Sequence, residues 1–303
     1  MSIFSKYKAA YGKAFNEEMC WDIALRDITN GGMWKIIPMT SSRYWGADPF
    51  LWHHEDKLYL FYERYDCQRN IGELAVREVN SDLSTGQERC ILCRPYHLSF
   101  PNVFEYKGEF FLIPETSANR SIEVYRAISF PDKWELYKTI VSNISAVDTI
   151  IFSQQDDRII LLTSFSEGDA CRVENWLLYL DEKFNLIRRE KYKDFSDYGN
   201  RNAGKILQKG SESYRIGQDC RCGEYGKGLV YYLLNAQEEK EVKICVLKDF
   251  GILNAKYDGI HTYNEHETIQ TIDLRYKRKR SLWSKLCFLI YLGKAYVKRS
   301  FTR

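Results

Sequence analysis

Carboxylates recur at matching places in a repeated segment of this sequence. Asp48 begins the segment 48–63 and Asp148 begins a related one, while Glu63 and Glu115 end theirs 52 residues apart. Carboxylates brought together from different copies, one protonated and one ionised, could act as general acid and base. A second interpretation stays open, because an aspartate beside a proline, as in Asp48-Pro49, is also a common turn device.

The repeats indicate the elements that position these carboxylates. Each copy consists of an apolar strand, a polar turn and a second apolar strand, and the copies begin near residues 48, 100, 148 and 203. Further strand-like segments bring each unit to four strands in about 50 residues, which is typical of a β-propeller blade. Five such units fit into residues 21–276. We therefore predict an all-β fold, a five-bladed β-propeller, over a two-sheet sandwich, which would have no such period.

The order of the copies predicts which side chains meet. We place the fifth unit in residues 226–247 and expect early strands around residues 21–37 to complete it. In a propeller the innermost strands line the central channel, and their ends bring side chains from different blades to one mouth. We therefore expect Asp48, His97, Asp148 and Arg201, which lie at or near the openings of successive copies, around one funnel.

The C-terminal end differs from the body of the chain in charge. Basic residues number 44 and acidic residues 41, a net charge of +3, but nine of the basic residues and no acidic residue fall in residues 277–303. The rest, with 35 basic and 41 acidic residues, carries −6, which argues against a nucleic-acid-binding domain. We divide the chain into an N-terminal extension (1–20), the propeller (21–276) and a basic tail (277–303).

Apolar residues in the tail recur at spacings of three and four, which is typical of an amphipathic helix. Its cations and Trp283 suit an anionic membrane surface, although a helix packed on the propeller with a solvated basic face is the alternative. The apolar run 286–292 is too short to span a membrane, and residues 1–20 lack the apolar core of a secretion signal. We expect a cytoplasmic protein whose tail could hold it on the inner face of the cell membrane.

The sequence favours no metal and no cofactor. Without a secretion signal, the nine cysteines are expected to be reduced thiols. The pairs Cys90/Cys93 and Cys220/Cys222 could form a zinc site, but unpaired thiols are the favoured interpretation. There is no dense histidine–glutamate ligand motif, no P-loop and no dinucleotide-binding glycine motif.

Seven motifs along the chain resemble a known domain family. They are ADPF (47–50), HLSFPNVFEYKGEFFLIPET (97–116), VYRAISFPDKW (124–134), VDTIIF (147–152), NRNAGKI (200–206), RIGQDC (215–220) and GIHTYN (259–264). This pattern resembles the N-terminal domain of glucosamine inositolphosphorylceramide transferase, which also occurs in bacterial polysaccharide-biosynthesis proteins. The resemblance covers residues 20–275, and the family is in turn similar to the five-bladed propellers of glycoside hydrolase family 43.

The similarity to these hydrolases implies roles for three positions. Asp48 matches the aspartate that acts as base in the first blade, and Asp148 matches the aspartate that modulates it. Where the acidic glutamate is expected, this sequence has Asn200-Arg201-Asn202, and an arginine cannot donate a proton near neutral pH. Arg201 could instead hold a phosphate or carboxylate of an anionic donor or substrate. Glu115 is a third catalytic candidate through its repeat position.

Residues in or near these motifs are candidates for substrate contacts. They are Trp45, His97, Gln218, Asp219, Tyr225 and His261. The aromatic side chains could stack on a sugar ring, and the amide and carboxylate could bond to its hydroxyls. Either histidine could instead be structural.

Two functional hypotheses follow. The first is an enzyme of surface-polysaccharide or glycolipid synthesis that transfers or modifies a sugar, with a sugar or glycolipid as substrate and a nucleotide-sugar as a conceivable donor. A glycoside hydrolase is less favoured, because the expected acid glutamate is missing. The second is a non-catalytic glycan-binding module that positions substrate for a partner glycosyltransferase, since the plant protein of the resembling family has a separate transferase domain.

Overall fold

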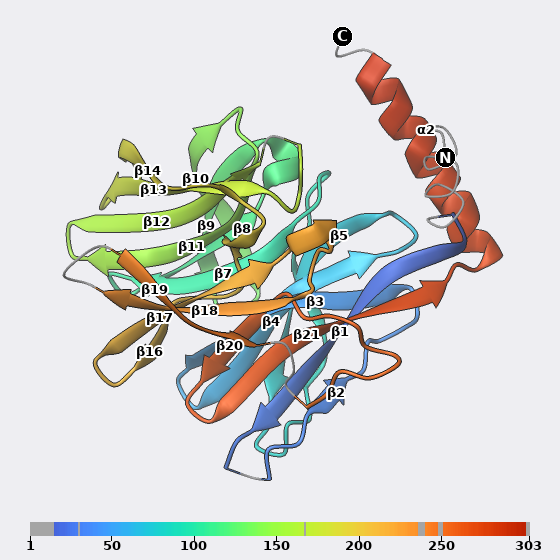
Figure 1. Ribbon diagram of the computed structural model, residues 1–303, viewed down its shortest axis with the longest axis horizontal. Helices are drawn as coiled ribbons and strands as arrows, with labels where there is room; N and C mark the ends of the chain where they lie inside the picture. Colours follow the sequence, from blue (N-terminus) through green and yellow to red (C-terminus); the bar gives the residue numbers. More distant parts are fainter. Residues whose placement is uncertain (1–14, 30, 167, 236–239, 248–250, 301–303) are drawn as a thin grey trace.

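The protein is a five-bladed β-propeller, as the repeats predict (Figure 1). The computed structural model describes residues 15–29, 31–166, 168–235, 240–247 and 251–300, and its propeller strands run from Glu17 to Lys279. Each blade is an antiparallel sheet, and sequence neighbours pair as hairpins. Apolar side chains pack between adjacent blades, as Phe50 does edge-on against Phe100 with ring centroids 4.9 Å apart.

The first three blades each take four consecutive strands. The first blade contains β3 (Tyr44–His54), β4 (Lys57–Asp66), β5 (Ile71–Val79) and β6 (Arg89–Leu92). The second contains β7 (Ser99–Tyr106), β8 (Glu109–Glu115), β9 (Ser121–Ser129) and β10 (Lys133–Ser142). The third contains β11 (Ala146–Gln155), β12 (Arg158–Ser166), β13 (Val173–Asp181) and β14 (Leu186–Ser196).

The last two blades differ from the predicted strand assignment. The fourth contains β15 (Tyr198–Asn202), β17 (Glu212–Asp219), β18 (Gly228–Asn235) and β19 (Lys240–Leu247), and β16 (Leu207–Lys209) pairs with β17. The fifth contains β20 (Tyr263–His266), β21 (Ile269–Lys279), β1 (Glu17–Asp27) and β2 (Lys35–Ile37). Placing the fifth blade in residues 226–247 was therefore wrong. The fourth blade begins earlier, at β15, and needs β18 and β19 as its outer strands.

Both ends of the propeller meet in the fifth blade. β1 pairs with β21 along its whole length, from Glu17 opposite Lys279 to Asp27 opposite Ile269. The predicted completion of the last blade by early strands is thus confirmed. This closure removes the free edges that an open ring of sheets would leave.

A backbone bulge repeats at the start of the inner strands. Asp48, Phe100 and Asp148 each have φ 50°, and the strand register shifts at each of these positions. A left-handed residue other than glycine is unfavourable, and a bulge redirects side chains at functional sites. The three residues therefore occupy equivalent places, as their positions in the repeats predict.

A helix, α2 (Leu282–Ser300), follows the last strand and extends away from the propeller (Figure 1). Its first turns contact the edge of the fifth blade, where the Lys285 ammonium donates to Asn16 Oδ1 and Arg280 pairs with Glu18 at 2.7 Å. Within the part of the chain that the structure describes, no helix is both long enough and apolar enough to cross a membrane.

Candidate functional site

Five acidic side chains, each from a different inner or second strand, meet around the channel. We call them, with their two basic partners, the acidic centre: Asp48, Glu63, Glu115, Asp148, Asp273, Arg201 and His261. The main chain helps to hold it. The N–H of Asp48 donates to Asp273 Oδ2 at 3.0 Å, that of Phe100 to Asp48 Oδ2 at 3.1 Å, and that of Asp148 to Glu115 Oε2 at 3.4 Å. Each bulge is thus tied to a carboxylate of the preceding blade.

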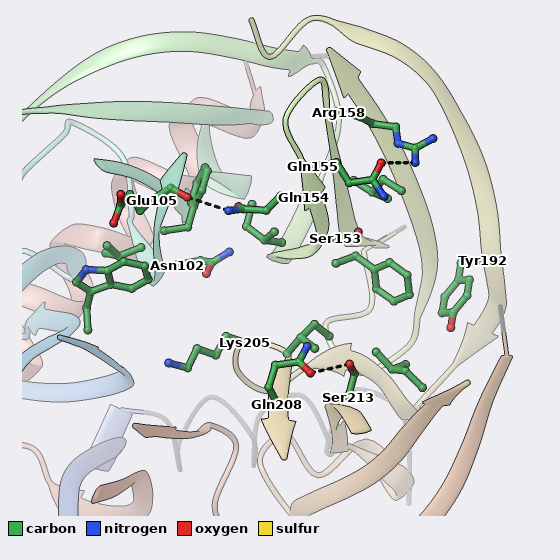
Figure 2. A pocket seen from close by; sticks show the side chains of 18 residues that line it. Asn102, Glu105, Ser153, Gln154, Gln155, Arg158, Tyr192, Lys205, Gln208 and Ser213 are labelled. Atoms are coloured by element: carbon green, nitrogen blue, oxygen red, sulfur yellow. Dashed lines mark hydrogen bonds between the residues drawn. The ribbon is translucent and has the colours of Figure 1, made fainter. Parts of the chain in front are cut away.

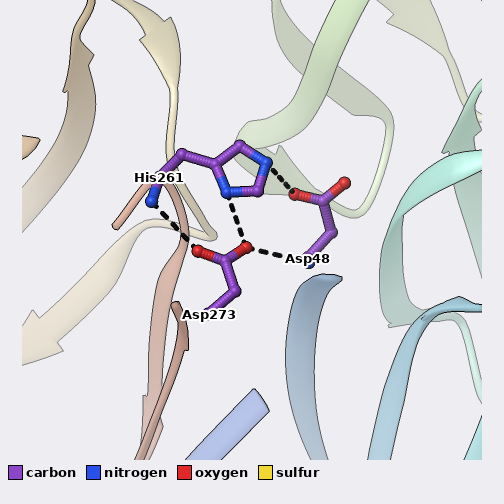
Figure 3. Close-up of side chains that lie close together, drawn as sticks. All are labelled: Asp48, His261 and Asp273. Carbon is purple, nitrogen blue, oxygen red and sulfur yellow. Dashed lines mark hydrogen bonds and ion pairs between the residues drawn. The ribbon is translucent and has the colours of Figure 1, made fainter. Parts of the chain in front are cut away.

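An imidazole lies between two of the aspartates (Figure 3). His261 Nδ1 is 2.7 Å from Asp273 Oδ2, and its Nε2 is 3.4 Å from Asp48 Oδ1. Trp21 stacks on the ring at a centroid distance of 3.9 Å. Burial opposes a charge on His261, but Asp273 and Asp48 outweigh it and raise the pKa of the imidazole. His261 can therefore carry a proton beside Asp48.

Asp48 is buried and weakly acidic. Burial raises its pKa to about 6, because the loss of water and the charge of Asp273 outweigh the attraction of His261. The Thr262 hydroxyl donates to Asp48 Oδ1 at 2.7 Å. A carboxylate with this pKa is ionised above pH 6 and retains enough basicity to accept a proton from a hydroxyl.

The second half of the acidic centre is an arginine with two acids. Arg201 forms a bidentate pair with Asp148, with Nε 2.6 Å from Oδ2 and Nη2 3.0 Å from Oδ1. Its Nη1 donates to Ala170 O at 2.9 Å, and its guanidinium lies 4.9 Å from the Tyr225 ring centroid. The structure therefore places Arg201 as the partner of Asp148, and most of its N–H groups are already engaged.

Glu115 differs from Asp48 in its protonation. Burial raises its pKa to about 8, with a further increase from the charge of Asp148, and Arg201 at 3.6 Å only partly offsets these effects. At neutral pH Glu115 therefore keeps its proton, while Asp48 has lost most of its own. Environments that separate the pKa values of neighbouring carboxyls assign one as acid and the other as base.

Glu63 and His97 form the rim between the first and second blades. His97 Nδ1 accepts the Gly72 N–H at 2.9 Å, and its Nε2 is 3.4 Å from Glu63 Oε1. Burial lowers the pKa of His97 to about 4, so the imidazole is neutral at physiological pH. Burial and the charge of Asp48 raise the pKa of Glu63. His97 thus borders the acidic centre through Glu63.

Three predicted substrate contacts have other partners in the structure. Gln218 Nε2 donates to Asn202 O at 2.9 Å and lies 3.4 Å from Asp148 Oδ2, inside the network. Asp219 accepts two bonds from the guanidinium of Arg221, which holds its carboxylate away from the network. Trp45 stacks face to face on Tyr65 at 4.3 Å, so one of its faces is covered. Their roles toward a sugar stay predictions.

Sequence reasoning missed Asp273, which binds His261 and three backbone N–H groups. The strand pairing repeats an acid at one position of the second strand. Glu63 faces Ala47 in the β3–β4 pair, and Glu115 faces Ser99 in the β7–β8 pair. In the fifth blade Tyr263 faces Ile272, which places Asp273 at the same register position of the second strand. The assignment of the fifth blade to residues 226–247 concealed this equivalence.

Asp48, His261 and Asp273 also form the one group of potential metal ligands within the described residues, with ligand atoms within 4.8 Å of one another. The Asp273 oxygens already accept the N–H groups of Asp48, His261 and Thr262 at 3.0 Å. A cation between them would have to replace the imidazole contacts. Eight of the nine cysteines are free thiols: Cys20, Cys67, Cys90, Cys93, Cys171, Cys220, Cys222 and Cys287.

The chain is similar to known proteins in sequence and in fold. The family described as "Glucosamine inositolphosphorylceramide transferase 1, N-terminal" matches residues 12–272. The glucosamine inositolphosphorylceramide transferase 1 of Arabidopsis thaliana is 31% identical over 211 residues, which are 65% of this chain and 27% of the plant protein. The chain therefore spans less than a third of the length of this curated relative.

The fold is shared with solved carbohydrate-active enzymes. A GH43_1 enzyme from Xanthomonas citri, complexed with xylotriose, superimposes with a TM-score of 0.58 at 10% identity over 80% of this chain and 89% of that one. A β-1,2-mannobiose phosphorylase from Listeria innocua gives a TM-score of 0.55 at 7% identity over 80% of this chain and 92% of that one. At these identities the likeness shows the propeller fold.

Proposed function

Because the chain belongs to the family of glucosamine inositolphosphorylceramide transferase 1 N-terminal domains, we propose that it acts on a sugar during the synthesis of a glycolipid or a surface polysaccharide. The name of its curated relatives supports glycolipid synthesis. The observation that carries an enzymatic role is the pair of buried carboxyls with separated pKa values, Asp48 at about 6 and Glu115 at about 8.

In the proposed reaction Asp48 is the base and Glu115 is the acid. Asp48 takes the proton from an acceptor hydroxyl, whose oxygen forms a bond with the sugar carbon as the bond to the leaving oxygen breaks. Glu115 gives its proton to that leaving oxygen. His261, held by Asp273, stabilises the ionised form of Asp48. Glu115 thus supplies the acid that is absent from the position of Arg201.

The geometry changes the expected role of Arg201. Its guanidinium neutralises Asp148 and limits the pKa of Glu115, so it acts as a positioning residue. The acidic centre has five carboxyl groups, of which Glu115 keeps its proton at neutral pH, against Arg201 and His261, so it favours neutral groups over a phosphate. An anionic donor would therefore need to present its charge outside the acidic centre.

The test is transfer of a radiolabelled sugar into lipid or polysaccharide by membranes from cells that express variants of the protein. Asp48→Asn and Glu115→Gln should each abolish incorporation while the protein remains folded. Asp56→Asn is the matched control, because Asp56 is exposed in the turn that follows β3. Normal incorporation by both Asp48→Asn and Glu115→Gln would contradict the enzymatic proposal.

The second candidate is a glycan-binding module. It is favoured by the length of the curated relatives, of which this chain covers 27% and 29%, so that the transferase activity in their name could reside outside the matching part. Under this alternative the chain positions substrate for a partner glycosyltransferase. Sugar binding that persists in Asp48→Asn and Glu115→Gln, with unchanged incorporation, would support it.

The C-terminal helix supports a location on the cytoplasmic face of an anionic membrane. Leu282, Trp283, Leu286, Leu289 and Ile290 are between 46% and 88% exposed, and helical periodicity places them on one side. On another side Cys287 is buried. An apolar stripe of this kind, in a segment without acidic residues, suits the interface between lipid headgroups and acyl chains.

A further inference from the structure

A large pocket opens at the other end of the inner strands. Its volume is about 900 Å³, and its lining contains none of the residues of the acidic centre. Trp52 follows Asp48 by four residues on β3, which corresponds to ~13 Å along a strand, and Lys205 lies in the bend that follows β15, four residues after Arg201. We call this space the distal pocket. It reaches from the channel to the gap between the third and fourth blades, where Phe152 and Tyr192 line it.

A belt of asparagines separates the two sites. Asn102 donates to Thr149 O at 3.4 Å, Asn202 to Asp148 O at 2.8 Å, and Asn264 to Pro49 O at 2.7 Å. Each of these bonds joins inner strands of adjacent blades, and Asn102 also lines the distal pocket. The distal pocket therefore lies beyond these asparagines and shares no lining residue with the acidic centre.

Lys205 points into this chamber opposite Asn102 (Figure 2). Its ammonium makes one hydrogen bond, to Leu51 O at 3.4 Å, and among the described residues no carboxylate lies within ion-pair distance of it. Burial lowers the pKa of Lys205 to about 8, although Glu265 partly offsets this effect. Lys205 thus makes no ion pair with a described residue, although the pocket lining also contains Glu105 and the charge of Glu265 acts on the ammonium from farther away. An anionic group placed beside Lys205 would gain both an ion pair and a shielded site.

The remaining lining suits a sugar ring. The Phe152 and Tyr192 rings meet edge to face, at an angle of 63° with centroids 5.7 Å apart, and Trp52 also lines the pocket. Amide side chains also line the pocket, among them Gln154 and Gln208 (Figure 2). Aromatic surfaces with a few placed polar groups are typical of small-molecule sites and fit the apolar faces and hydroxyls of a carbohydrate.

From these features we propose that the distal pocket binds an acidic sugar, with Lys205 paired to its carboxylate or phosphate and the aromatic and amide side chains against its ring. Arg158, the other basic side chain of this lining, is exposed and donates to Gln155, so Lys205 is the cation that lies inside the pocket. The site goes beyond the function proposed above and does not depend on it, since no residue of the acidic centre contributes.

The experiment measures binding to the full chain by isothermal titration calorimetry. The probes are glucuronic acid, glucose 6-phosphate, glucose and inorganic phosphate, at pH 7. Both acidic sugars should bind at least about tenfold more tightly than glucose, as expected for a buried charge-assisted contact. They should also bind more tightly than inorganic phosphate, which lacks the ring. Binding of the acidic sugars should weaken at pH 9, where Lys205 loses its proton.

Two variants separate the contribution of the Lys205 charge to binding from that of the aromatic contact with the sugar ring. Lys205→Met should reduce the affinity for both acidic sugars to that of glucose. Its matched control, Lys183→Met, removes an exposed lysine that does not line the distal pocket, and should change nothing. Phe152→Ala should weaken the binding of all three sugars. Because it tests the pocket at a second residue, the proposal stays testable if Lys205→Met does not fold.

Three results would overturn the proposal. They are equal binding of glucose and the acidic sugars, equal binding of inorganic phosphate and glucose 6-phosphate, and unchanged affinity in Lys205→Met. Asp48→Asn should retain the wild-type affinities. The outcome for the distal pocket is therefore independent of whether the acidic centre catalyses a reaction.

Discussion

Replacing Glu115 by glutamine should stabilise the fold, and increasingly so as the pH rises. Glu115 has an ordinary pKa of 4.5 and a pKa of about 8 in the folded protein. The folded state therefore binds the proton more tightly than the unfolded chain does. For an acid shifted in this direction, the contribution to stability is complete below the unfolded pKa and is lost as the pH rises through the folded pKa.

The magnitude follows from the shift. One pKa unit corresponds to about 1.4 kcal/mol, so ionisable Glu115 costs about 3 kcal/mol of unfolding free energy at pH 7 and about 5 kcal/mol at pH 8.5. At pH 5 the cost is below about 1 kcal/mol. Glutamine cannot ionise and keeps an oxygen that can accept the Asp148 N–H. Glu115→Gln should recover most of these amounts, as expected where a functional residue is retained at the expense of stability.

Urea unfolding followed by tryptophan fluorescence at pH 5, 7 and 8.5 tests this. Glu109→Gln is the control, since Glu109 lies on the same strand with a side chain 57% exposed beside Arg126. The gain in Glu115→Gln should grow from the lowest to the highest pH, while Glu109→Gln stays close to wild type throughout. A Glu115→Gln protein that is less stable than wild type at pH 8.5, or a change independent of pH, would refute the assigned protonation.

Three further predictions follow from the same contacts. Sugar transfer should rise through pH 6, as Asp48 ionises, and fall above pH 8, as Glu115 loses its proton; a flat profile between pH 5 and 9 in the incorporation assay would contradict these roles. Arg201→Met should lower the unfolding free energy by about 3–5 kcal/mol, because Asp148 stays buried without its partner. Adding Asp148→Asn should restore much of that loss in urea denaturation, whereas an additive loss would show that the pair is not coupled. Trp283→Ser should reduce flotation with anionic liposomes even at high salt, and unchanged flotation would show that the apolar stripe of α2 does not enter lipid.

The sequence predicts the propeller well because its period is a local property of hairpins. The offset between Glu63 and Glu115, and the shared bulge at Asp48 and Asp148, depend on strand length and turn position, which the chain encodes within each copy. The wrong assignment of the fifth blade to residues 226–247 also has a local cause. The short strand β16 pairs with β17 as β15 does, so the β16–β17 hairpin resembles the opening hairpin of a copy, and the strands after it are predicted to belong to the next blade.

The chemistry of the acidic centre was less predictable, because it depends on contacts between distant residues. Arg201 lies 53 positions from Asp148, and only the closed ring shows that the two form a bidentate pair rather than an open anion site. Likewise, the repeat position of Glu115 identifies it as a candidate acid. The sequence does not show that its carboxyl keeps a proton at neutral pH. Burial and the neighbouring charge of Asp148 set that pKa, and both arise only in the folded protein.

The structure also bears on whether these carboxylates are turn devices or chemical groups. Asp181 is a structural acid on the surface, where hydrogen bonds from Asn185 lower its pKa. Asp48 and Glu115 accept backbone N–H groups too, yet burial and neighbouring acids raise their pKa values instead. A carboxylate needed only to hold a turn would gain nothing from such surroundings, because an amide could accept the same N–H at lower cost. Asp48 and Glu115 therefore link adjacent blades through the backbone N–H groups that they accept. Because both are acids and not amides, they can also carry out the proposed proton transfers.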